Sequence, residues 1–535
     1  MKIKQLFNNV QDITLKSYLS KCGIDNVDEY INGCTLEDDN HYDNIDKIPL
    51  SNKYESIYVL VDCDVDGYMS ASMLTIFLKQ LGYKIIPILH DSKKHGLTDN
   101  VMNILSFGDE PKLLWIPDAG TNDVEQCKTL KKKYNYTIII SDHHLQSQDN
   151  PYAIIVNNQM SPNVINKEGC GCLVTYHCIH NINPQLANSL ISYVMIATLG
   201  DGMNLISQEN RCFMKWGRMK IHPNLQPFVT LNKDDTNRGF SYGMIPCLNS
   251  MIRLGTLKEK EQLFCALCGE TTNEMFDILS TPFDINDIIE RCKYYHNKQQ
   301  TDSAKLADNL KIDDNENVII SEIEDTPLTG LVANKIMSKY NKPTILVHKK
   351  DNQYIGSMRS PIEFSDIINK SNVAKCYGHA EAAGVFINDI DKFKEYIYHL
   401  TLFQPYTDVL ISSRVNSIPN DLYSLKRLGN ELWGNGISEP SFNIYDIHIN
   451  SSDIRELGAN KLTIKFTYQG VDFIHFFTSN KLKEELHMDK ATKIILNVIG
   501  TLDWNEYHGK RTKQVIMDKI ECVEDEHIIT MEDLF

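Results

Sequence analysis

The residues of this chain that could do chemistry are aspartates and histidines in four short groups. They are Asp62, Asp64 and Asp66 in the stretch DCDVDG, then Asp118, the run Asp142-His143-His144, and Asp201 in the stretch TLGDG. Five or more carboxylates in one crevice repel one another unless cations lie between them. Oxygen ligands with one or two imidazoles suit Mn²⁺ or Mg²⁺ better than Zn²⁺. We therefore expect divalent cations as cofactors, with Mn²⁺ as the first candidate and Mg²⁺ as the second.

Two such cations about 4 Å apart can hydrolyse a phosphodiester, because together they activate a water and neutralise the leaving oxygen. The residues therefore predict a two-metal phosphoesterase. A calcium loop of the EF-hand type does not fit, because the position that needs a bidentate glutamate is Met73, inside an apolar run. The remaining alternative is that DCDVDG forms a solvated turn, and the three further acidic groups disfavour it.

Three of the acidic groups directly follow predicted strands, and this placement predicts where the groups come together in the fold. Apolar runs at residues 57–61, 113–117 and 137–141 each end in an acidic group, with helices predicted between them. Strands that alternate with helices indicate a parallel sheet covered on both faces. Functional groups gather at the carboxyl ends of such strands. Asp201 follows an apolar helix predicted at 189–199, and we expect it to reach the same edge.

The remainder of the chain divides into further predicted units. The fold class is α/β, with a parallel-sheet domain, a helical connector, a smaller second α/β domain and a C-terminal barrel of the oligonucleotide-binding (OB) type. A short helix is expected in the N-terminal segment, from the spacing of Leu6, Val10 and Ile13. The predicted boundaries are 1–50 for the N-terminal segment, 51–205, 206–310, 311–404 and 405–522 for the four units in that order, and 523–535 for an acidic tail.

Composition limits the partners and the location of the protein. The 535 residues include 54 Lys and Arg against 70 Asp and Glu, a net charge of −16. The chain as a whole therefore repels a phosphate backbone, and a nucleic-acid site must be a local basic patch. Without a run of 18 apolar residues or a signal peptide, we expect a soluble monomer without membrane contacts. Its location would be the cytoplasm of a bacterium, or of the host cell if a bacteriophage encodes it.

The cysteines do not indicate a metal site of the usual spacing. Fourteen cysteines are scattered along the chain, and the closest pairs are Cys170/Cys172 and Cys265/Cys268. Neither pair has a second pair of cysteines or histidines at the spacing that zinc sites use. We expect buried, reduced cysteines.

At this point the residues resemble a known family. DCDVDG, Asp118, Asp142-His143-His144 and Asp201 are similar to the four motifs of the DHH phosphoesterase superfamily, in its RecJ-type branch of single-strand exonucleases. GLVANKIMSKYNKPTIL, GSMRS and YGHAEAAG resemble the DHH-associated domain. LGNELWGNGISEPSF and IGTLDWNEYHGKRTKQVIMDKIE resemble the OB domain of RecJ. The resemblance covers about residues 55–520.

The resemblance implies a role for each matching residue. Asp64 and Asp66 would bind two metal ions, Asp118 would bridge them, and His143 and Asp201 would complete the second site. Asp142 would orient an imidazole or tune a ligand from behind, and His144 would face the scissile phosphate. The family often has a histidine where this chain has Leu60, so the resemblance leaves the role of Asp62 open; it could supply that ligand.

A second set of residues is expected to contact nucleic acid. Arg359 can present a bidentate fork to a phosphate, and His379 can donate to a phosphoryl oxygen or protonate the leaving group. Ser357, Ser360 and Gly378 lie in the same two motifs. The predicted barrel hairpin adds Trp504, Tyr507, Lys510, Arg511 and Lys513, because bases stack on aromatic rings while cations follow the phosphates. The alternative is a solvated hairpin with Trp504 in the barrel core.

Together these features predict a metal-dependent exonuclease of single-stranded DNA that acts in recombination, repair or replication. The resemblance implies 5′ to 3′ polarity. One alternative is a phosphodiesterase of short oligonucleotides or cyclic dinucleotides, and another is an inactive single-strand-binding scaffold of a replisome. The acidic tail ends in Leu534 and Phe535 and would dock on a single-strand-binding or replisome protein, unless it is simply a frayed terminus.

Overall fold

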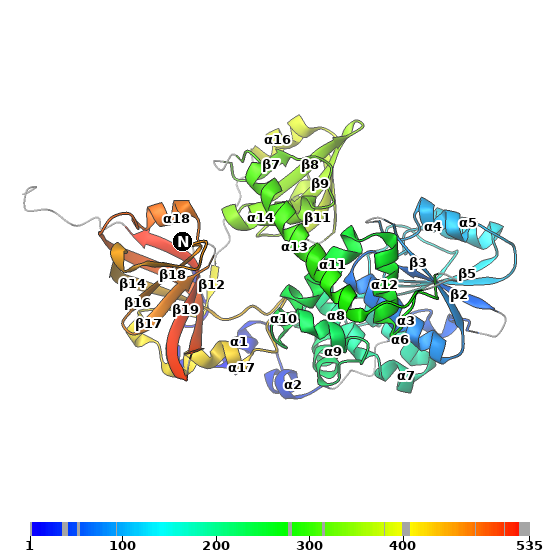
Figure 1. Ribbon diagram of the computed structural model, residues 1–535, viewed down its shortest axis with the longest axis horizontal. Coiled ribbons are helices and arrows are strands. Elements are labelled where there is room, and N and C mark those ends of the chain that lie inside the picture. Colours follow the sequence, from blue (N-terminus) through cyan, green and yellow to red (C-terminus); the bar gives the residue numbers. More distant parts are fainter. Residues whose placement is uncertain are drawn as a thin grey trace, which may run out of the picture.

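The computed structural model shows three globular units around a helical centre (Figure 1). One α/β domain lies at one end of the molecule, the barrel lies at the other, and the second α/β domain lies above the long helix that leaves the centre. The structure describes residues 3–34, 41–50, 54–91, 94–276, 281–312, 316–378, 380–398, 407–476, 478–507 and 509–523.

The first α/β domain is built on a five-stranded parallel sheet in the order β3-β2-β4-β5-β6. Its strands are β2 (Ser56–Val61), β3 (Lys84–Leu89), β4 (Lys112–Pro117), β5 (Tyr136–Asp142) and β6 (Ile154–Asn157). Every residue of β4 is buried. Leu113 and Trp115 pack into the core on one face of the sheet, whereas Leu114 and Ile116 pack into the core on the other. The sheet is therefore covered on both faces, which confirms the predicted parallel-sheet domain.

Different helices cover the two faces of this sheet. The larger core is formed against α3 (Val65–Gln80), α6 (Gly171–Ile182) and α8 (Ile191–Gly200), whereas α4 (Asp99–Leu105) and α5 (Val124–Lys133) cover the opposite face. Helix α8 is apolar almost all round and is buried from Ser192 to Thr198. It thus forms part of the core, and its C-terminal end carries Asp201 towards the sheet.

The helical connector continues the larger core towards the centre of the molecule. It consists of α9 (Gln208–Met219), α10 (Asn237–Tyr242), α11 (Met244–Leu254), α12 (Leu257–Leu267) and α13 (Ile285–Asn309), and a short α7 (Pro184–Asn188) precedes α8. Helix α13 has 25 residues and leads to the second α/β domain. Met251 and Ile252 of α11 and Ile288 and Cys292 of α13 are buried in the same core as the first sheet. The connector is therefore continuous with the first domain.

The second α/β domain has a mixed five-stranded sheet in the order β10-β11-β9-β8-β7. Its elements are β7 (Ile319–Glu322), α14 (Thr329–Tyr340), β8 (Thr344–Lys350), β9 (Gln353–Arg359), α15 (Ser365–Asn369), β10 (Ala374–Gly378), β11 (Ala382–Ile387) and α16 (Ile390–Tyr398). Helix α14 packs on one face, and α15 and α16 pack on the other. Only β7 and β8 of this sheet pair in parallel.

The C-terminal unit is a seven-stranded sheet in the order β13-β14-β18-β19-β17-β16-β15. Its strands are β13 (Ser412–Ser413), β14 (Ser441–Asn450), β15 (Arg455–Leu457), β16 (Thr463–Tyr468), β17 (Val471–His475), β18 (Lys493–Tyr507) and β19 (Lys510–Val523), with the short helices α17 (Leu425–Leu428) and α18 (Asn480–Glu485). Strands β18 and β19 pair along almost their whole length, from Ile495/Val523 to Tyr507/Lys510. These strands form the predicted hairpin.

The N-terminal segment differs from the expectation of one helix around Leu6, Val10 and Ile13. That prediction is wrong: β1 (Ile3–Gln5) pairs in parallel with β12 (Thr407–Val409), and a 3-10 turn follows at Val10–Asp12. The helices come later, as α1 (Leu15–Lys21) and α2 (Val27–Asn32). The physical reason is a pairing between residues some 400 positions apart, which local periodicity does not report.

Two further features bear on the composition of the chain. All fourteen cysteines lie among the described residues, none of them forms a disulfide, and ten of them are buried. Within the described ranges, no helix is both long enough and apolar enough to cross a membrane.

The N-terminal segment packs into the barrel core, and this gives a prediction for stability. Leu19 of α1 is fully buried among barrel residues, and its neighbour Tyr18 contacts the ring of Trp433. Leu19→Ala should lower the free energy of unfolding of the barrel by roughly 2–5 kcal/mol through lost burial and a cavity. Denaturant unfolding followed by tryptophan fluorescence measures this loss. Leu145→Ala, at a position 76% exposed, is the control, and equal midpoints for the two variants would contradict the packing.

Candidate active site

The predicted acidic groups meet at one edge of the first sheet. Asp62 follows β2, Asp118 follows β4, and Asp142 is the last residue of β5. The strand order changes direction between β2 and β4, since β3 lies on one side of β2 and β4 on the other. Such a switch point opens a crevice at the carboxyl ends of the strands. Asp201 reaches it from the C-terminal end of α8.

Six predicted metal-ligating residues come within coordination range of one another. Ligand atoms of Asp62, Asp64 and Asp118 lie within 4.8 Å of one another, and so do those of Asp66, His143 and Asp201. The Nε2 atom of His143 lies 3.4 Å from Asp118 Oδ1 and 3.5 Å from Asp201 Oδ2. The two groups are therefore adjacent, with the His143 ring between Asp118 and Asp201.

The cluster is short of positive charge and of hydrogen-bond donors. Asp118 Oδ1 and Asp201 Oδ2 are buried and accept no hydrogen bond from any described residue. Burial raises the pKa of both carboxyls well above the usual value, and the neighbouring aspartates raise it further. Burial, together with the charge of Asp64, raises the pKa of Asp66 to about 6. Hard, oxygen-seeking divalent cations would relieve this repulsion, so the residues fit the metal ions expected from the sequence.

Helix ends position the aspartates of the first group. Asp64 caps the N-terminus of α3, where its side chain accepts a hydrogen bond from the Gly67 N–H at 3.1 Å. Asp66 accepts hydrogen bonds at the N-terminus of α6 from the N–H groups of Gly171 (2.7 Å) and Cys172 (2.9 Å). The partial positive charge of a helix N-terminus stabilises a carboxylate there.

Two glycines are needed where the chain crowds the carboxylates. A Cβ on Gly171 would lie 2.2 Å from Asp118 Oδ1, and a Cβ on Gly67 would lie 2.6 Å from Asp62 Cβ. Asp118 itself has a φ of 64°, a left-handed conformation that aspartate and asparagine tolerate better than most residues. Close packing and backbone conformation thus restrict which residue types can occupy positions 67, 118 and 171.

Asp142 orients a histidine, and that histidine is His144. The buried Asp142 carboxylate accepts hydrogen bonds from His144 Nδ1 (2.8 Å) and the Thr121 hydroxyl (2.7 Å). Burial alone would raise the pKa of Asp142, but the hydrogen bond and charge of His144 hold that pKa below its usual range. Although burial opposes protonation, Asp142 raises the pKa of His144 to about 9. His144 is therefore an imidazolium at neutral pH, with its side chain 56% exposed.

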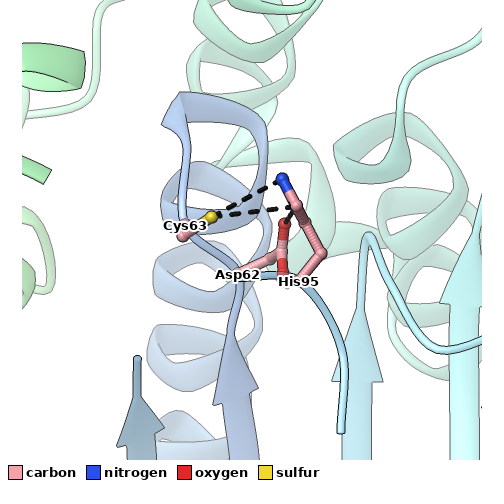
Figure 2. Close-up of side chains that lie close together, drawn as sticks. All are labelled: Asp62, Cys63 and His95. Carbon is pink, nitrogen blue, oxygen red and sulfur yellow. Dashed lines mark hydrogen bonds and ion pairs between the residues drawn. The ribbon is translucent and has the colours of Figure 1, made fainter. Parts of the chain in front are cut away.

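The position where the family often has a histidine is occupied by a core residue. Leu60 is fully buried on the face of the sheet that α4 and α5 cover, away from the cluster. Asp62, two residues later, is buried beside Asp64 and Asp118. It also accepts hydrogen bonds from His95 Nδ1 at 2.5 Å and from the Gly96 N–H at 3.2 Å (Figure 2). Asp62 thus has the placement of a ligand, and His95 is a neighbour that the sequence analysis missed.

A second missed residue is Arg253, whose charge acts on Arg359. Arg359 ends β9, and burial and the charge of Arg253 on α11 both lower its pKa. No carboxylate of a described residue pairs with either guanidinium, and Arg253 Nε is buried without a hydrogen-bond partner among the described residues. Two guanidinium groups that influence each other without an acidic partner could bind an anion such as a phosphate. Arg253 could not be found from local spacing, because α11 and β9 belong to different units.

Ser357, Ser360 and Gly378 lie near the end of the same sheet. Ser357 is part of β9, and Ser360 is buried directly after it. Gly378 ends β10 with a φ of 134°, and a Cβ there would lie 2.9 Å from the Ala382 carbonyl oxygen. His379 lies outside the described residues, as do the tail positions 524–535.

The barrel hairpin presents fewer free aromatic faces than expected. The Trp504 Nε1–H donates to the Ser424 hydroxyl at 3.2 Å, and the Arg511 guanidinium lies 4.3 Å from the centre of the tryptophan ring. Lys513 lies over Tyr423, another ring in contact with Trp504. Trp504 is therefore partly buried against the barrel, whereas Tyr507 and Lys510 are exposed at the tip.

Comparisons with known proteins agree with this fold. The family model described as the DHH family N-terminal domain matches residues 56–198, and the RecJ OB domain model matches residues 418–519. Residues 56–198 thus match a DHH-family domain and residues 418–519 match the OB domain of RecJ, so the predicted resemblance is confirmed. The predicted domain boundaries remain predictions.

Relatives are similar over most of their length. A prophage-derived protein of Bacillus subtilis, named a single-strand DNA-specific exonuclease, is 29% identical over 544 residues, covering 90% of this chain and 92% of the relative. RecJ of Haemophilus influenzae is 23% identical, covering 88% of each chain. The structure of Thermus thermophilus RecJ in complex with Mn²⁺ matches with a TM-score of 0.72 at 17% identity, covering 98% of this chain and 79% of that one.

The repulsion in the cluster predicts a variant that is more stable without metal. Asp118→Asn keeps the side-chain shape, suits the positive φ and removes one charge. We expect the metal-free variant to be more stable by about 1 kcal/mol at pH 8. At pH 5, below the pKa of about 6 of Asp66, the cluster already holds protons, so the gain should be smaller. Thermal unfolding of metal-free protein at both pH values measures the difference.

The same variant should lose most of the stabilisation that Mn²⁺ gives to the wild type, because a central ligand is weakened. Asp109→Asn, at an exposed position, is the matched control and should behave like the wild type. A metal-free Asp118→Asn protein that is less stable than the wild type at pH 8 would contradict the proposed repulsion.

Proposed function

We propose that this protein is a metal-dependent exonuclease that hydrolyses the phosphodiester bonds of single-stranded DNA from the 5′ end. The observation that carries the proposal is the group of five aspartates and His143 at one sheet edge. Three of the aspartates are buried and two are half-buried, and two buried carboxylate oxygens have no hydrogen-bond partner among the described residues. Relatives that align with most of this chain are named single-strand DNA-specific exonucleases. The biological setting that fits this activity is recombination, repair or replication of DNA.

We propose two divalent cations as cofactors, with Mn²⁺ preferred and Mg²⁺ as a substitute. Thermus thermophilus RecJ has been solved with each of these ions. When bound, the ions would activate a water and neutralise the leaving oxygen. Asp62, Asp64 and Asp118 would hold one ion, and Asp66, His143 and Asp201 would hold the other, with Asp118 reaching both.

The protonated His144 lies beside this centre and is held by Asp142. Because its pKa is about 9, His144 carries a positive charge at neutral pH and would bind a phosphoryl oxygen of the substrate. The hydrogen bond from Nδ1 to Asp142 leaves Nε2 as the donor for the substrate. Asp142 is therefore a positioning residue, and its pKa below the usual range keeps it ionised.

Arg359 and Arg253 would hold a phosphate of the strand between the connector and the second α/β domain. Both are short of acidic partners among the described residues, so a phosphate would supply the missing negative charge. His379 is proposed to assist at the scissile phosphate. Ser357, Ser360 and Gly378 would let the strand approach closely, and Tyr507, Lys510, Arg511 and Lys513 with Trp504 would contact DNA on the barrel.

The cellular context completes the proposal. We place the enzyme in the cytoplasm of a bacterium or of a phage-infected host, acting as a monomer. The acidic tail at 523–535, with its apolar tip, would dock on a single-strand-binding or replisome protein. Deletion of the last seven residues should weaken that contact without changing cleavage of free DNA.

The central test is digestion of single-stranded DNA labelled at the 5′ or the 3′ end. Wild-type protein should release labelled mononucleotides from the 5′ end with Mn²⁺, more slowly with Mg²⁺, and not with a chelator. Asp118→Asn should bind the strand and cleave it at least a thousandfold more slowly, because a ligand of both ions is lost. Cleavage of dinucleotides but not of long strands would favour the short-oligonucleotide alternative, and binding without cleavage would favour the scaffold.

The arginine pair gives a second prediction. Arg253→Ala and Arg359→Ala should each lower kcat/KM for single-stranded DNA roughly tenfold to a hundredfold, as expected for the loss of one charge-assisted contact of about 1.5–3 kcal/mol. Steady-state kinetics at fixed salt measures the effect. Arg291→Ala removes a guanidinium that already has Gln262 and Glu259 as partners and is the control. Unchanged kinetics in Arg253→Ala would remove that residue from the substrate site.

A further inference from the structure

A second group of metal-binding side chains lies beside Asp62, and its chemistry differs from that of the aspartate cluster. Ligand atoms of Asp62, Cys63 and His95 lie within 4.8 Å of one another. Figure 2 shows the Cys63 sulfur directed towards the His95 ring, with the Asp62 carboxylate below it. The sulfur lies 3.7 Å from each nitrogen of the ring. One thiol, one imidazole and one carboxylate are thus brought together.

A buried histidine adds an independent observation. His90 follows β3, and its side chain is 2% exposed. Its Nε2 atom has no hydrogen-bond partner among the described residues and lies 3.8 Å from Asp62 Oδ1. A buried ring nitrogen without a partner is costly, so a ligand that binds it would stabilise the site. His90 lies beside Asp62 but outside the group of three, so its ring nitrogen would have to move closer to bind the same ion.

We propose that Asp62, Cys63, His90 and His95 form a zinc-type metal site, and that zinc bound there inhibits the nuclease by taking Asp62 from the catalytic centre. The donor set of sulfur, imidazole nitrogen and carboxylate oxygen is the one that Zn²⁺ prefers, whereas Mn²⁺ and Mg²⁺ prefer oxygen. This site binds a different metal, through a different set of residues, from the catalytic centre of the proposed function. Its inhibitory effect rests on that function.

The geometry needs both histidines to move, because His90 lies outside the group within 4.8 Å and the Cys63 sulfur is equidistant from the two nitrogens of the His95 ring. Tetrahedral zinc holds nitrogen and sulfur ligands roughly 3.5 Å apart, close to the 3.7 Å between Cys63 Sγ and the His95 nitrogens. Asp62 Oδ2 and His95 Nδ1 are 2.5 Å apart because a proton joins them, so they would separate by roughly 1 Å. The His95 side chain is 57% exposed in the loop after β3 and has room to move. Zinc would displace the proton of the Cys63 thiol and the proton shared by His95 and Asp62.

Sequence spacing does not predict this zinc site, because its ligands come from the ends of two different strands. Asp62 and Cys63 follow β2, whereas His90 and the loop to His95 follow β3, the neighbouring parallel strand. The expectation that the cysteines are buried without a metal role therefore needs correction for Cys63 if the site binds. The shared ligand Asp62 is what couples the site to the aspartate cluster.

Binding is tested with Co²⁺ as a spectroscopic substitute for zinc on full-length protein, in excess Mg²⁺ to occupy the aspartate cluster. A sulfur-to-cobalt charge-transfer band should appear in the wild type, disappear in Cys63→Ser, and remain in Cys376→Ser, the control for loss of a half-buried thiol. In His95→Gln, which changes an exposed side chain, the Kd for Zn²⁺ measured by competition should rise at least tenfold. Absence of the band in the wild type, or its persistence in Cys63→Ser, would overturn the site.

The inhibitory effect is tested separately, so that the site and the nuclease can fail independently. Cleavage of single-stranded DNA with Mn²⁺ is measured at increasing Zn²⁺, relative to the zinc-free rate of each protein. The zinc concentration for half inhibition should be at least tenfold higher in His95→Gln than in the wild type. Equal inhibition in both proteins would overturn the link between the site and catalysis. A cobalt band in a protein without nuclease activity would leave the site standing and count against the proposed function alone.

Discussion

The main physical constraint on this structure is the mutual repulsion of the carboxylates that are buried at the sheet edge. Asp66 and Asp118 are almost completely buried, and Asp201 lies beside them with the Nε2 atom of His143 at 3.5 Å from its carboxylate. Burial of like charges is unfavourable by itself, so the surrounding fold has to hold these residues in place. The N-terminus of α6 holds Asp66, the N-terminus of α3 is capped by Asp64, and the C-terminal end of α8 supplies Asp201. The large core beneath the cluster offsets the cost of this arrangement.

The first α/β domain could be predicted because its information is local. Each strand is a short apolar run, and the acidic residues follow the runs directly, so the strand ends and the sheet edge come from the sequence within a few residues. The rule that parallel strands gather functional groups at their carboxyl ends then places Asp62, Asp118 and Asp142 together. The sequence also carried the motifs of the second α/β domain and of the barrel, although Trp504 packs against the barrel instead of presenting a free face.

The features that sequence analysis missed depend on contacts between distant segments. The N-terminal strand β1 exists because β12 lies beside it, and no property of residues 3–5 alone reports that pairing. His95 matters because it hydrogen-bonds to Asp62, and Arg253 matters because its charge acts on Arg359 of another unit. A lone histidine or arginine in a sequence has no signature of this kind. Such residues can be recognised as functional candidates only in the structure, where an unpartnered charge or ring nitrogen lies beside them.

The long helix α13 mechanically couples the first domain to the second α/β domain. At 25 residues it spans about 37 Å, and one end lies against the core of the first domain while the other leads to the second α/β domain. Near its first end, Cys292 contacts Met251 and Gln299 accepts a hydrogen bond from Ser250 of α11. A helix held at one end acts as a lever, so a small tilt there becomes a larger displacement at the far end. Because α11 carries Arg253 and the second α/β domain carries Arg359, a tilt of α13 would move these two arginines relative to each other.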